Sequence, residues 1–365
     1  MTQQFKVPMS RPDVGRDEIK AILSVLDDGW VSQGKVTQEF EAQLSRYLSS
    51  NVIVVNNGSS ALMCALIAHG LKPKDKVIVP AFTFVATSSI PKLLGAKVIV
   101  ADIDPITLNI SLESVEQKLR KYPDVKFVIT VDVAGMPADI GSFVELSRRH
   151  HFTLIDDAAE AFGAQYKKRM LGSYDHTTIF SFQVAKQITT IEGGCIATLD
   201  EKMLGKMNKI KDYGRNSIER YVHDVAGANF RTTDLQSAMG LAQLKKVDKY
   251  ISNRNKIARQ YREEIKELES QSVPAYVTKH SYMLFFALAK DKKNRNRYLE
   301  CLNAAGIDAR KCWTPIHMQP CNLELRNAKC DNAERTFDRA LTLPIYNSMG
   351  SDEVKSVIEA CSSLN

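Results

Sequence analysis

The stretch FSFQVAKQITTIEGG, residues 180–194, joins a β-favouring apolar run to a loop that carries one lysine, Lys186, and closes on two glycines. The run that leads into it, residues 177–182, has the length and composition of a buried strand. A surface lysine needs no such surroundings. An amine that is partly removed from water and held in place can act as a nucleophile, so this setting predicts covalent chemistry at Lys186.

Six further β-rich runs alternate with helical patterns through the first two-thirds of the chain. This alternation predicts an α/β fold with a largely parallel sheet covered by helices on both faces. After about residue 240 a long helix leads into mixed helices and strands. We therefore expect a large domain over residues 1–240 and a smaller C-terminal α+β domain over residues 241–365. The six further strands are expected at residues 51–55, 76–80, 97–102, 125–130, 152–157 and 195–199.

The composition is that of an ordinary globular protein, with 44% hydrophobic and 25% charged residues in 365. The net charge of +7 favours small anionic substrates such as sugar phosphates and nucleotides. The basic residues are spread along the chain without a nucleic-acid motif, so we expect no nucleic-acid partner.

No apolar run is long enough to span a bilayer, and the N-terminus has no apolar signal core, so we expect a cytoplasmic protein without a membrane partner. The seven cysteines are scattered and are expected to be reduced thiols. Cys312, His317, Cys321 and Cys330 follow no standard zinc spacing, and we expect no metal.

Ligands of open α/β sheets bind at the carboxyl ends of the strands. Unusual residues follow several of the expected strands, so we expect segments that are distant in sequence to meet in one crevice. These residues are 56–60, 80–84, 132, 156–160 and 181–186.

The motif NNGSSAL, residues 56–62, lies where a strand passes into a helix. Free amides and the helix dipole at Gly58 and Ser59 suit a phosphate group. A plain helix cap is the alternative, because serine is favoured at that position.

Asp156 and Asp157 end an apolar strand. Side chains alternate along a strand, so one carboxylate faces the crevice and the other faces away. The inward carboxylate could pair with a protonated heterocycle, a metal or an arginine. Pyridoxal phosphate (PLP) needs an amine for its aldehyde, an acid for its pyridine nitrogen, donors for its phosphate and a flat surface for its ring. Lys186, the inward aspartate, the expected phosphate site and the aromatic strand end PAFTF together match this set.

On these motifs the chain resembles the DegT/DnrJ/EryC1/StrS family of PLP-dependent sugar aminotransferases, within the fold type I aspartate aminotransferase superfamily. The resemblance runs from DDGWVSQGKVTQEFE (27–41) to LTLPIY (341–346), and the lysine segment and GANFRTTDLQ (227–236) are its most specific parts. It implies a mostly parallel seven-stranded sheet between helices, followed by a smaller α+β domain.

The resemblance also implies roles around the cofactor ring. Lys186 would form the Schiff base with the cofactor aldehyde, and Asp157 would keep the pyridine nitrogen protonated. Phe84 would stack on the ring. Glu160 stands beside the phenolic oxygen, where the family usually has glutamine or histidine, and its charge would repel a phenolate unless it is protonated or turned away.

For the phosphate, the resemblance implies the amides of Gly58 and Ser59 and the hydroxyl of Ser181. Asn229 would reach the phosphate in the neighbouring subunit, which makes a homodimer part of the active site. Two further departures from the family, Ile191 in place of a common glycine and Gln183 at a variable position, bear on the substrate. Trp313 and His317 are expected to border the sugar.

The implied activity is transfer of an amino group from glutamate to a keto-sugar, carried on a nucleoside diphosphate, in polysaccharide or glycan biosynthesis. A cyclitol or a keto-sugar without a nucleotide is the alternative substrate, and a non-catalytic PLP-binding regulatory protein is the alternative class. A dehydratase subgroup with histidine at the lysine position is disfavoured by Lys186. A Rossmann dehydrogenase is disfavoured because no G-x-G-x-x-G follows the first strand.

Overall fold

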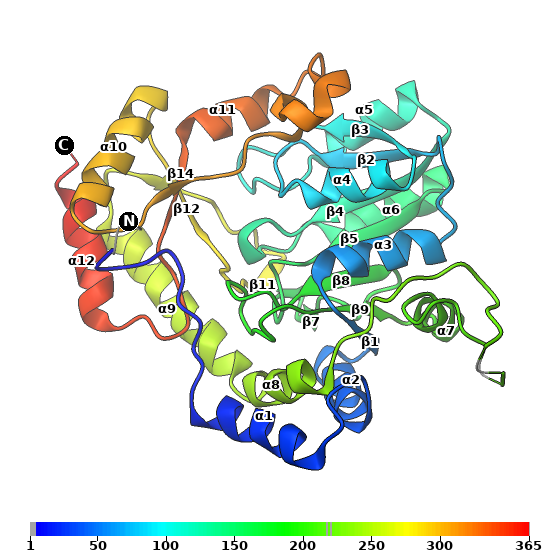
Figure 1. Cartoon of the computed structure of the whole chain (residues 1–365). Helices are drawn as coiled ribbons and strands as arrows, with labels where there is room; N and C mark the ends of the chain where they lie inside the picture. The colour runs from blue at the N-terminus through cyan, green and yellow to red at the C-terminus, as the bar shows by residue number, and fades with distance from the viewer. Residues whose placement is uncertain (1–4, 217, 220, 365) are drawn as a thin grey trace.

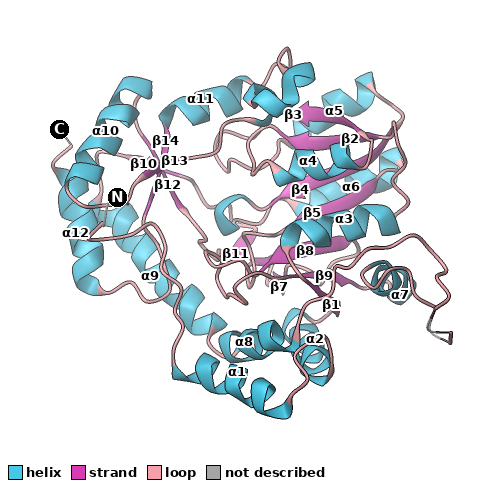
Figure 2. Ribbon diagram, viewed as in Figure 1, coloured by secondary structure: helices cyan, strands magenta, loops and turns pink. Residues whose placement is uncertain are grey.

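The computed structural model describes residues 5–216, 218–219 and 221–364. Figure 1 shows a larger α/β region on the right and a smaller region on the left, where both termini lie. Helices surround the large sheet (Figure 2).

The large sheet has seven strands in the order β1-β9-β8-β5-β4-β2-β3. Neighbouring strands from β3 to β8 run parallel, and β9 runs antiparallel to both β8 and β1. Six of the seven strands therefore share one direction, which confirms the mostly parallel sheet. All seven predicted strands are present, with bounds within one residue of those expected. They are β1 (Asn51–Val55), β2 (Lys76–Pro80), β3 (Lys97–Ala101), β4 (Val125–Val131), β5 (Thr153–Asp157), β8 (Thr177–Ser181) and β9 (Gly194–Thr198).

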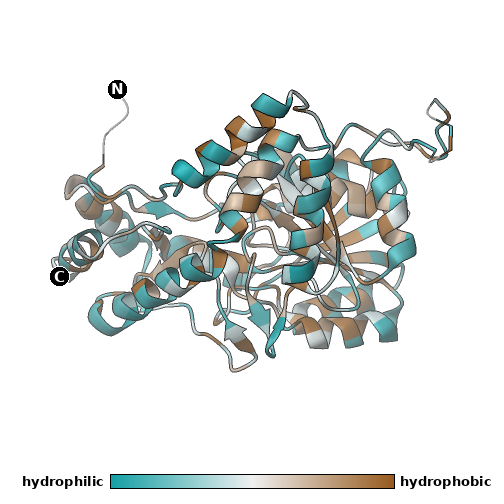
Figure 3. Ribbon diagram, turned by 90° about the horizontal axis from the view of Figure 1, so that it is seen from below, coloured by the Kyte–Doolittle hydropathy of each residue, from teal (hydrophilic) through white to brown (hydrophobic). Residues whose placement is uncertain are grey.

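Both faces of this sheet are buried, which explains why its strands are continuous apolar runs. In β2, Val77 and Val79 pack into the core under α3, whereas Ile78 packs into the core under α5 and α6. Several of the covering helices have one polar and one apolar side (Figure 3). The helices of this region are α1 (Arg16–Asp28), α2 (Lys35–Leu48), α3 (Gly58–Ala68), α4 (Ala86–Leu93), α5 (Leu112–Lys121), α6 (Ile140–His150), α7 (Glu201–Ile210) and α8 (Asp234–Leu244), with a 3-10 turn η1 (Val133–Gly135).

The smaller region contains a four-stranded sheet in the order β10-β12-β14-β13, and all its pairs are antiparallel. A third, three-stranded sheet joins β11 to the hairpin β6-β7. The remaining elements are β6 (Gln165–Tyr166), β7 (Arg169–Met170), α9 (Val247–Glu264), β10 (Glu269–Ser270), β11 (Val277–Lys279), β12 (Phe285–Leu288), α10 (Lys292–Ala304), β13 (Arg310–Lys311), η2 (Ile316–Met318), η3 (Pro320–Leu325), α11 (Asp331–Arg339), β14 (Ala340–Leu343) and α12 (Ser351–Ser362).

The helix α9 connects the two regions. Val247 and Ile251 pack in a core of the large region, while Ile257 and Tyr261 pack in the core of the smaller one. Val7, near the N-terminus, also packs in the smaller core and pairs with Ile307. The division at residue 240 stays a prediction.

Among the described residues, none of the helices has the length and apolar character needed to cross a bilayer.

Candidate active site

The site lies at the carboxyl edge of the large sheet. Strands β1, β2, β4, β5 and β8 point the same way, so the segments that follow them reach the same edge. Gly58 and Ser181 show how closely two of these segments approach. A Cβ atom on Gly58 would lie 3.0 Å from Cβ of Ser181 and 3.3 Å from its Oγ. The absence of a side chain at residue 58 therefore lets the start of α3 lie against the end of β8.

The first turn of α3 presents amides to this edge. The side chain of Asn57 accepts from the amide of Ser60 at 2.8 Å, and the Asn57 carbonyl accepts from the amide of Ala61 at 3.0 Å. The preceding amides, those of Gly58 and Ser59, have no acceptor within the part of the chain that the structure describes. Together with the helix dipole and the adjacent Ser181 hydroxyl, these amides have the chemistry that suits an anion.

Asp157 ends β5 and turns its carboxylate toward the same edge. Its Oδ2 accepts from the hydroxyl of Thr87 at 3.0 Å, and its Oδ1 accepts from the amide of Ala159 at 3.2 Å. Burial raises the pKa of Asp157 to about 6, although these hydrogen bonds and the charge of Lys186 oppose the shift.

Asp156 points to a different set of groups, as the alternation of side chains predicted. Its Oδ1 accepts from the hydroxyl of Thr130 at 2.8 Å, and its Oδ2 lies 3.7 Å from Nε2 of His176. Both aspartates are buried. Asp156, which points away from the site, therefore faces the protein interior and not solvent.

Lys186 follows β8, and its side chain is only 14% exposed. Its Nζ lies 3.1 Å from Sδ of Met283 and 4.0 Å from Oε1 of Glu160. The other oxygen of Glu160 accepts from the amide of Ala134 at 2.8 Å. Burial raises the pKa of Glu160 above its ordinary value, and the charge of Lys186 and the Ala134 amide oppose this shift.

The loop that carries Lys186 is anchored to the smaller region. The Gln187 side chain donates to the hydroxyl of Ser281 at 2.9 Å, and its carbonyl accepts from the side chain of Asn347 at 2.9 Å. Further along the loop, Ile191 has a φ of 71°, which is strained for a β-branched residue, and its side chain is exposed.

Phe84 and Asn229 lie in two loops that are far apart in the sequence, one after β2 and one beside the end of β1. The Phe84 side chain is 56% exposed after β2, and its carbonyl accepts from the amide of Thr87 at 3.2 Å. The carbonyl of Asn229 lies 3.5 Å from Nδ2 of Asn56, at the end of β1. The segment that carries Asn229 therefore passes close to the end of β1 in its own chain, and its reach into a second subunit stays a prediction.

Trp313 and His317 belong to the smaller region but approach the end of β2. The Trp313 ring packs against the Phe82 and Phe286 rings, with centroids 5.5 and 5.8 Å apart. The backbone beside His317 is held because the amide of Ile316 donates to the carbonyl of Ala81 at 2.7 Å. The buried His317 side chain contacts Glu334 on α11, at 3.0 Å from Nε2.

Two contact residues were missed by the sequence reasoning. Thr87 could have been found, because it lies in the motif PAFTFVAT, three residues after Phe84. The contact of Met283 could not have been predicted, because its segment YMLFFALAK has the composition of an ordinary buried strand. Only the folded chain brings its sulfur to Lys186.

The side chains at this edge fit PLP. Free amides at the start of a helix suit its phosphate, a buried carboxylate suits its ring nitrogen, and an amine suits its aldehyde. In the described residues, no group of three or more His, Cys, Asp or Glu side chains is arranged to hold a metal ion. The sheet, the smaller region and this set of side chains define a fold type I PLP-dependent transferase.

The chain belongs to the DegT/DnrJ/EryC1/StrS aminotransferase family, whose model matches residues 12–362. It is 32% identical to the GDP-perosamine synthase of Escherichia coli O157:H7, over 98% of each chain. It is 31% identical to the GDP-perosamine synthase of Caulobacter vibrioides, over 99% of this chain and 98% of that protein.

Solved structures agree with this assignment. PseC of Helicobacter pylori, an aminotransferase involved in the biosynthesis of pseudoaminic acid, superposes with a TM-score of 0.92 at 25% identity, covering 99% of both chains. The PLP form of Spr1654 from Streptococcus pneumoniae has the same TM-score and identity and covers 98% of both chains. The protein is thus a PLP-dependent aminotransferase.

Proposed function

We propose that this protein transfers an amino group from glutamate to a keto-sugar carried on a nucleoside diphosphate, for polysaccharide or glycan biosynthesis. The observation that carries the proposal is Lys186 at the carboxyl edge of the sheet, beside Asp157, in a chain similar over nearly its whole length to two proteins named GDP-perosamine synthase.

In this proposal the residues around the ring have separate tasks. PLP, when bound, supplies an electron sink for the carbon that loses a proton. With PLP bound, Lys186 would hold its aldehyde, and the free amine would move a proton at Nζ. The carboxylate of Asp157 holds a proton on the ring nitrogen, and Thr87 orients that carboxylate through its hydroxyl. Phe84 supplies a flat surface for the ring.

Phosphate binding is assigned to the amides of Gly58 and Ser59 and to the Ser181 hydroxyl. Asn229 is proposed to complete the phosphate site in the partner subunit of a homodimer. Its segment contacts the end of β1, next to the phosphate site, which supports a place for it at a shared edge.

The substrate is assigned to the side of the site that carries Trp313 and His317, because their loop is held against the segment that leads to Phe84. The net charge of +7 supports an anionic substrate such as a nucleotide sugar. The cytoplasm is the proposed compartment, which suits seven free thiols.

A mass measurement tests the activity. The PLP-loaded protein is incubated with ¹⁵N-glutamate and one acceptor at a time. The acceptors are a panel of keto-sugar nucleotides, free keto-sugars and keto-cyclitols. The expected product is a ¹⁵N-labelled amino-sugar nucleotide together with 2-oxoglutarate. A label found only in a cyclitol or a free sugar would show that the substrate is of that class and not a nucleotide-linked keto-sugar. A cofactor absorbance that glutamate never changes would favour a binding protein without turnover.

A further inference from the structure

The closest polar partner of the Lys186 amine is a sulfur atom. Nζ of Lys186 donates to Sδ of Met283 at 3.1 Å, whereas Oε1 of Glu160 lies further away, at 4.0 Å. Among the described residues, this sulfur is the one acceptor within hydrogen-bonding distance of the amine. A thioether accepts hydrogen bonds weakly and has no proton to donate, so the contact can hold the amine without binding it tightly.

The backbone of Met283 is fixed at both of its polar groups. Its amide donates to the carbonyl of Ala134 at 2.8 Å, and its carbonyl accepts from the Arg254 side chain at 3.2 Å. The preceding residue, Tyr282, has a φ of 45°, which is uncommon for an aromatic residue and persists only where surrounding contacts enforce it. Met283 itself is 9% exposed, so its sulfur has little freedom to move away from Lys186.

One residue, Ala134, ties together the two side chains that face the amine. Its amide donates to Oε2 of Glu160 at 2.8 Å, and its carbonyl accepts from the amide of Met283. Ala134 lies in η1 with a φ of 61°, in the left-handed region that favours glycine. A Cβ on the next residue, Gly135, would lie 2.9 Å from the backbone of both Glu160 and Tyr282, so a glycine there allows their close approach. The turn η1 therefore sets the positions of both groups around the amine.

We propose that Met283 is a positioning residue for Lys186, whose sulfur directs the amine toward the aldehyde of PLP during covalent attachment. In that step the nitrogen of Lys186 bonds to the aldehyde carbon, and the aldehyde oxygen leaves as water with the two hydrogens of the amine. A weak acceptor aligns one N–H and leaves the nitrogen lone pair free. The same weakness lets the amine move away from the sulfur when the new bond forms.

Packing alone is the competing explanation, because methionine often fills irregular space in protein cores. Two substitutions separate the two roles. Met283→Leu keeps the volume and the apolar character but has no acceptor, whereas Met283→Gln has a similar length and keeps an acceptor. If the sulfur positions the amine, glutamine should serve better than leucine. If the sulfur only fills space, leucine should serve better than glutamine.

The attachment step can be measured apart from turnover. The full chain, freed of its cofactor, is mixed with PLP, and borohydride reduction stops the reaction at successive times so that the label on Lys186 can be counted. Met283→Leu should slow this labelling about tenfold, as expected for the loss of one weak hydrogen bond, and Met283→Gln should stay within about threefold of the natural protein.

Binding of pyridoxamine phosphate provides the readout that does not need Lys186 to attack, because this molecule has no aldehyde. Its affinity should change by less than about twofold in Met283→Leu, since the sulfur acts on the amine and not on the ring or the phosphate. Met207→Leu is the matched control. Met207 is fully buried in α7 and makes no contact with Lys186, so this change should alter neither labelling nor affinity.

Urea unfolding should rank the two Met283 variants in the opposite order to labelling. Leucine replaces methionine with little loss of stability, whereas a mostly buried glutamine amide is costly unless all its hydrogen bonds are made. A leucine variant that is stable but slow to label, beside a glutamine variant that is less stable but faster, would separate positioning from packing.

Three results would overturn the inference. They are labelling in Met283→Leu as fast as in the natural protein, labelling in Met283→Gln slower than in Met283→Leu, or equal losses of labelling and pyridoxamine phosphate affinity in Met283→Leu. The inference rests on the role of Lys186 in the proposed function, and the two can fail separately. A borohydride label on another lysine would contradict that role, whereas normal labelling of Lys186 in Met283→Leu would contradict only the positioning by Met283.

Discussion

The Nζ of Lys186 lies 4.0 Å from Oε1 of Glu160, with both side chains largely buried at the carboxyl edge of the sheet. Glu160 thus faces the amine that we assign to covalent chemistry, while its other oxygen is held by the Ala134 amide. A buried carboxyl is costly to ionise, so the proton on Glu160 is retained to higher pH than in a solvated glutamate.

Replacing Glu160 with glutamine should change how PLP affinity depends on pH. As pH rises through the raised pKa of Glu160, its negative charge develops where the phenolic oxygen of the cofactor is expected, so PLP binding by the natural protein should weaken. The Glu160→Gln variant should lack this decrease and keep turnover within about tenfold, because glutamine preserves size and hydrogen bonding. PLP titrations between acidic and alkaline pH measure the effect, and parallel curves for the two proteins would contradict it.

Lys186→Ala should abolish transamination and covalent attachment of PLP. Borohydride reduction of the loaded natural protein, followed by peptide mapping, should place a phosphopyridoxyl group on Lys186. Lys186→Arg is the matched control, because it keeps a positive charge beside Glu160 but has no amine that can attack an aldehyde. A label on any other lysine of the natural protein would refute the assignment.

Asp157→Asn should lower kcat by about a hundredfold or more, because a carboxamide does not hold the ring nitrogen protonated as a carboxylate does. Asp156→Asn is the control, since Asp156 contacts Thr130 and not Thr87. Its kcat should change far less. Similar losses in both variants would indicate a structural effect of the whole strand end.

The same Asp157→Asn change should stabilise the cofactor-free protein at neutral pH. Burial raises the pKa of Asp157 from 3.8 to about 6, so the folded state binds its proton more tightly than the unfolded state. Stability from this group is complete below pH 3.8 and is lost as pH rises through about 6. This difference in proton affinity corresponds to roughly 3 kcal/mol, which the variant should regain in urea unfolding at neutral pH but not in acid.

Gly58→Ala should weaken PLP binding about tenfold, because its Cβ would lie 3.0 Å from Cβ of Ser181 and would push the start of α3 away from the end of β8. Gly205→Ala is the matched control, since a Cβ there meets nothing within 4 Å. That change lies inside α7 and should stabilise the protein by about 0.5–1 kcal/mol without affecting PLP. PLP titration and urea unfolding separate the two effects.

Arg254→Met should destabilise the protein by about 1–3 kcal/mol, because buried hydrogen-bond acceptors would lose their donor. The Arg254 side chain is buried in α9 and donates to the carbonyls of Tyr282, Met283 and Ile345 and to the side chain of Asn347, at 2.7–3.2 Å. Burial without a carboxylate partner lowers its pKa to about 9. Removing the Arg254 side chain leaves these acceptors unpaired. Two of them belong to Met283, which contacts Lys186, and to Asn347, which anchors the loop of Lys186.

The exposed Arg259, on the same helix, provides the control for this change. Arg259→Met should alter the free energy of unfolding by no more than about 0.5 kcal/mol. Equal urea midpoints for the two variants would show that the buried hydrogen bonds of Arg254 carry little stability.

Much of this architecture could be predicted from the sequence, because the relevant signals are local. Residues 76–80 form a strand because the three β-branched residues Val77–Val79 favour extended structure and are buried on both faces of the sheet. Lys186 was predicted from its own neighbours in the sequence. The alternation of side chains also predicted that Asp156 and Asp157 would face different groups, although not which partners each would meet.

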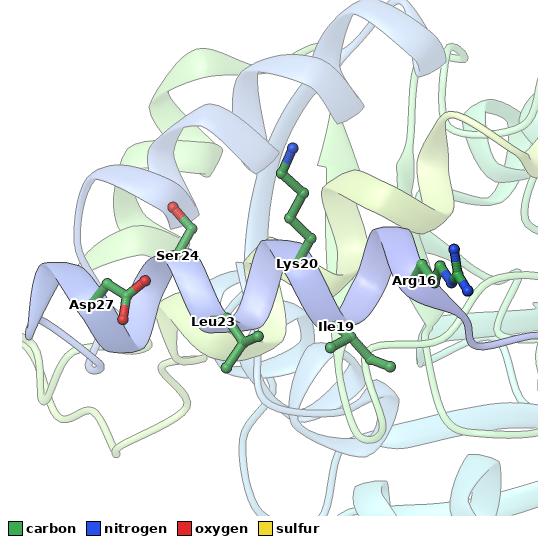
Figure 4. Close-up of a pocket in the computed structure, with 6 residues that line it drawn as sticks. All are labelled: Arg16, Ile19, Lys20, Leu23, Ser24 and Asp27. Atoms are coloured by element: carbon green, nitrogen blue, oxygen red, sulfur yellow. The ribbon is translucent and has the colours of Figure 1, made fainter.

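The tertiary structure alone decided contacts between residues far apart in the chain. The sulfur of Met283 reaches Lys186 because the smaller region packs over the carboxyl edge of the sheet, and no pattern around residue 283 encodes that approach. The exposure of Ile19, Leu23 and Leu26 could not be predicted either. Figure 4 shows the first two among the residues that line a shallow depression along α1. Helical spacing shows that a helix has an apolar face but not which face its neighbours cover. The spacing of apolar residues along a chain predicts its helices and strands. Which side chains are buried, and which distant residues come into contact, depends on how those helices and strands pack.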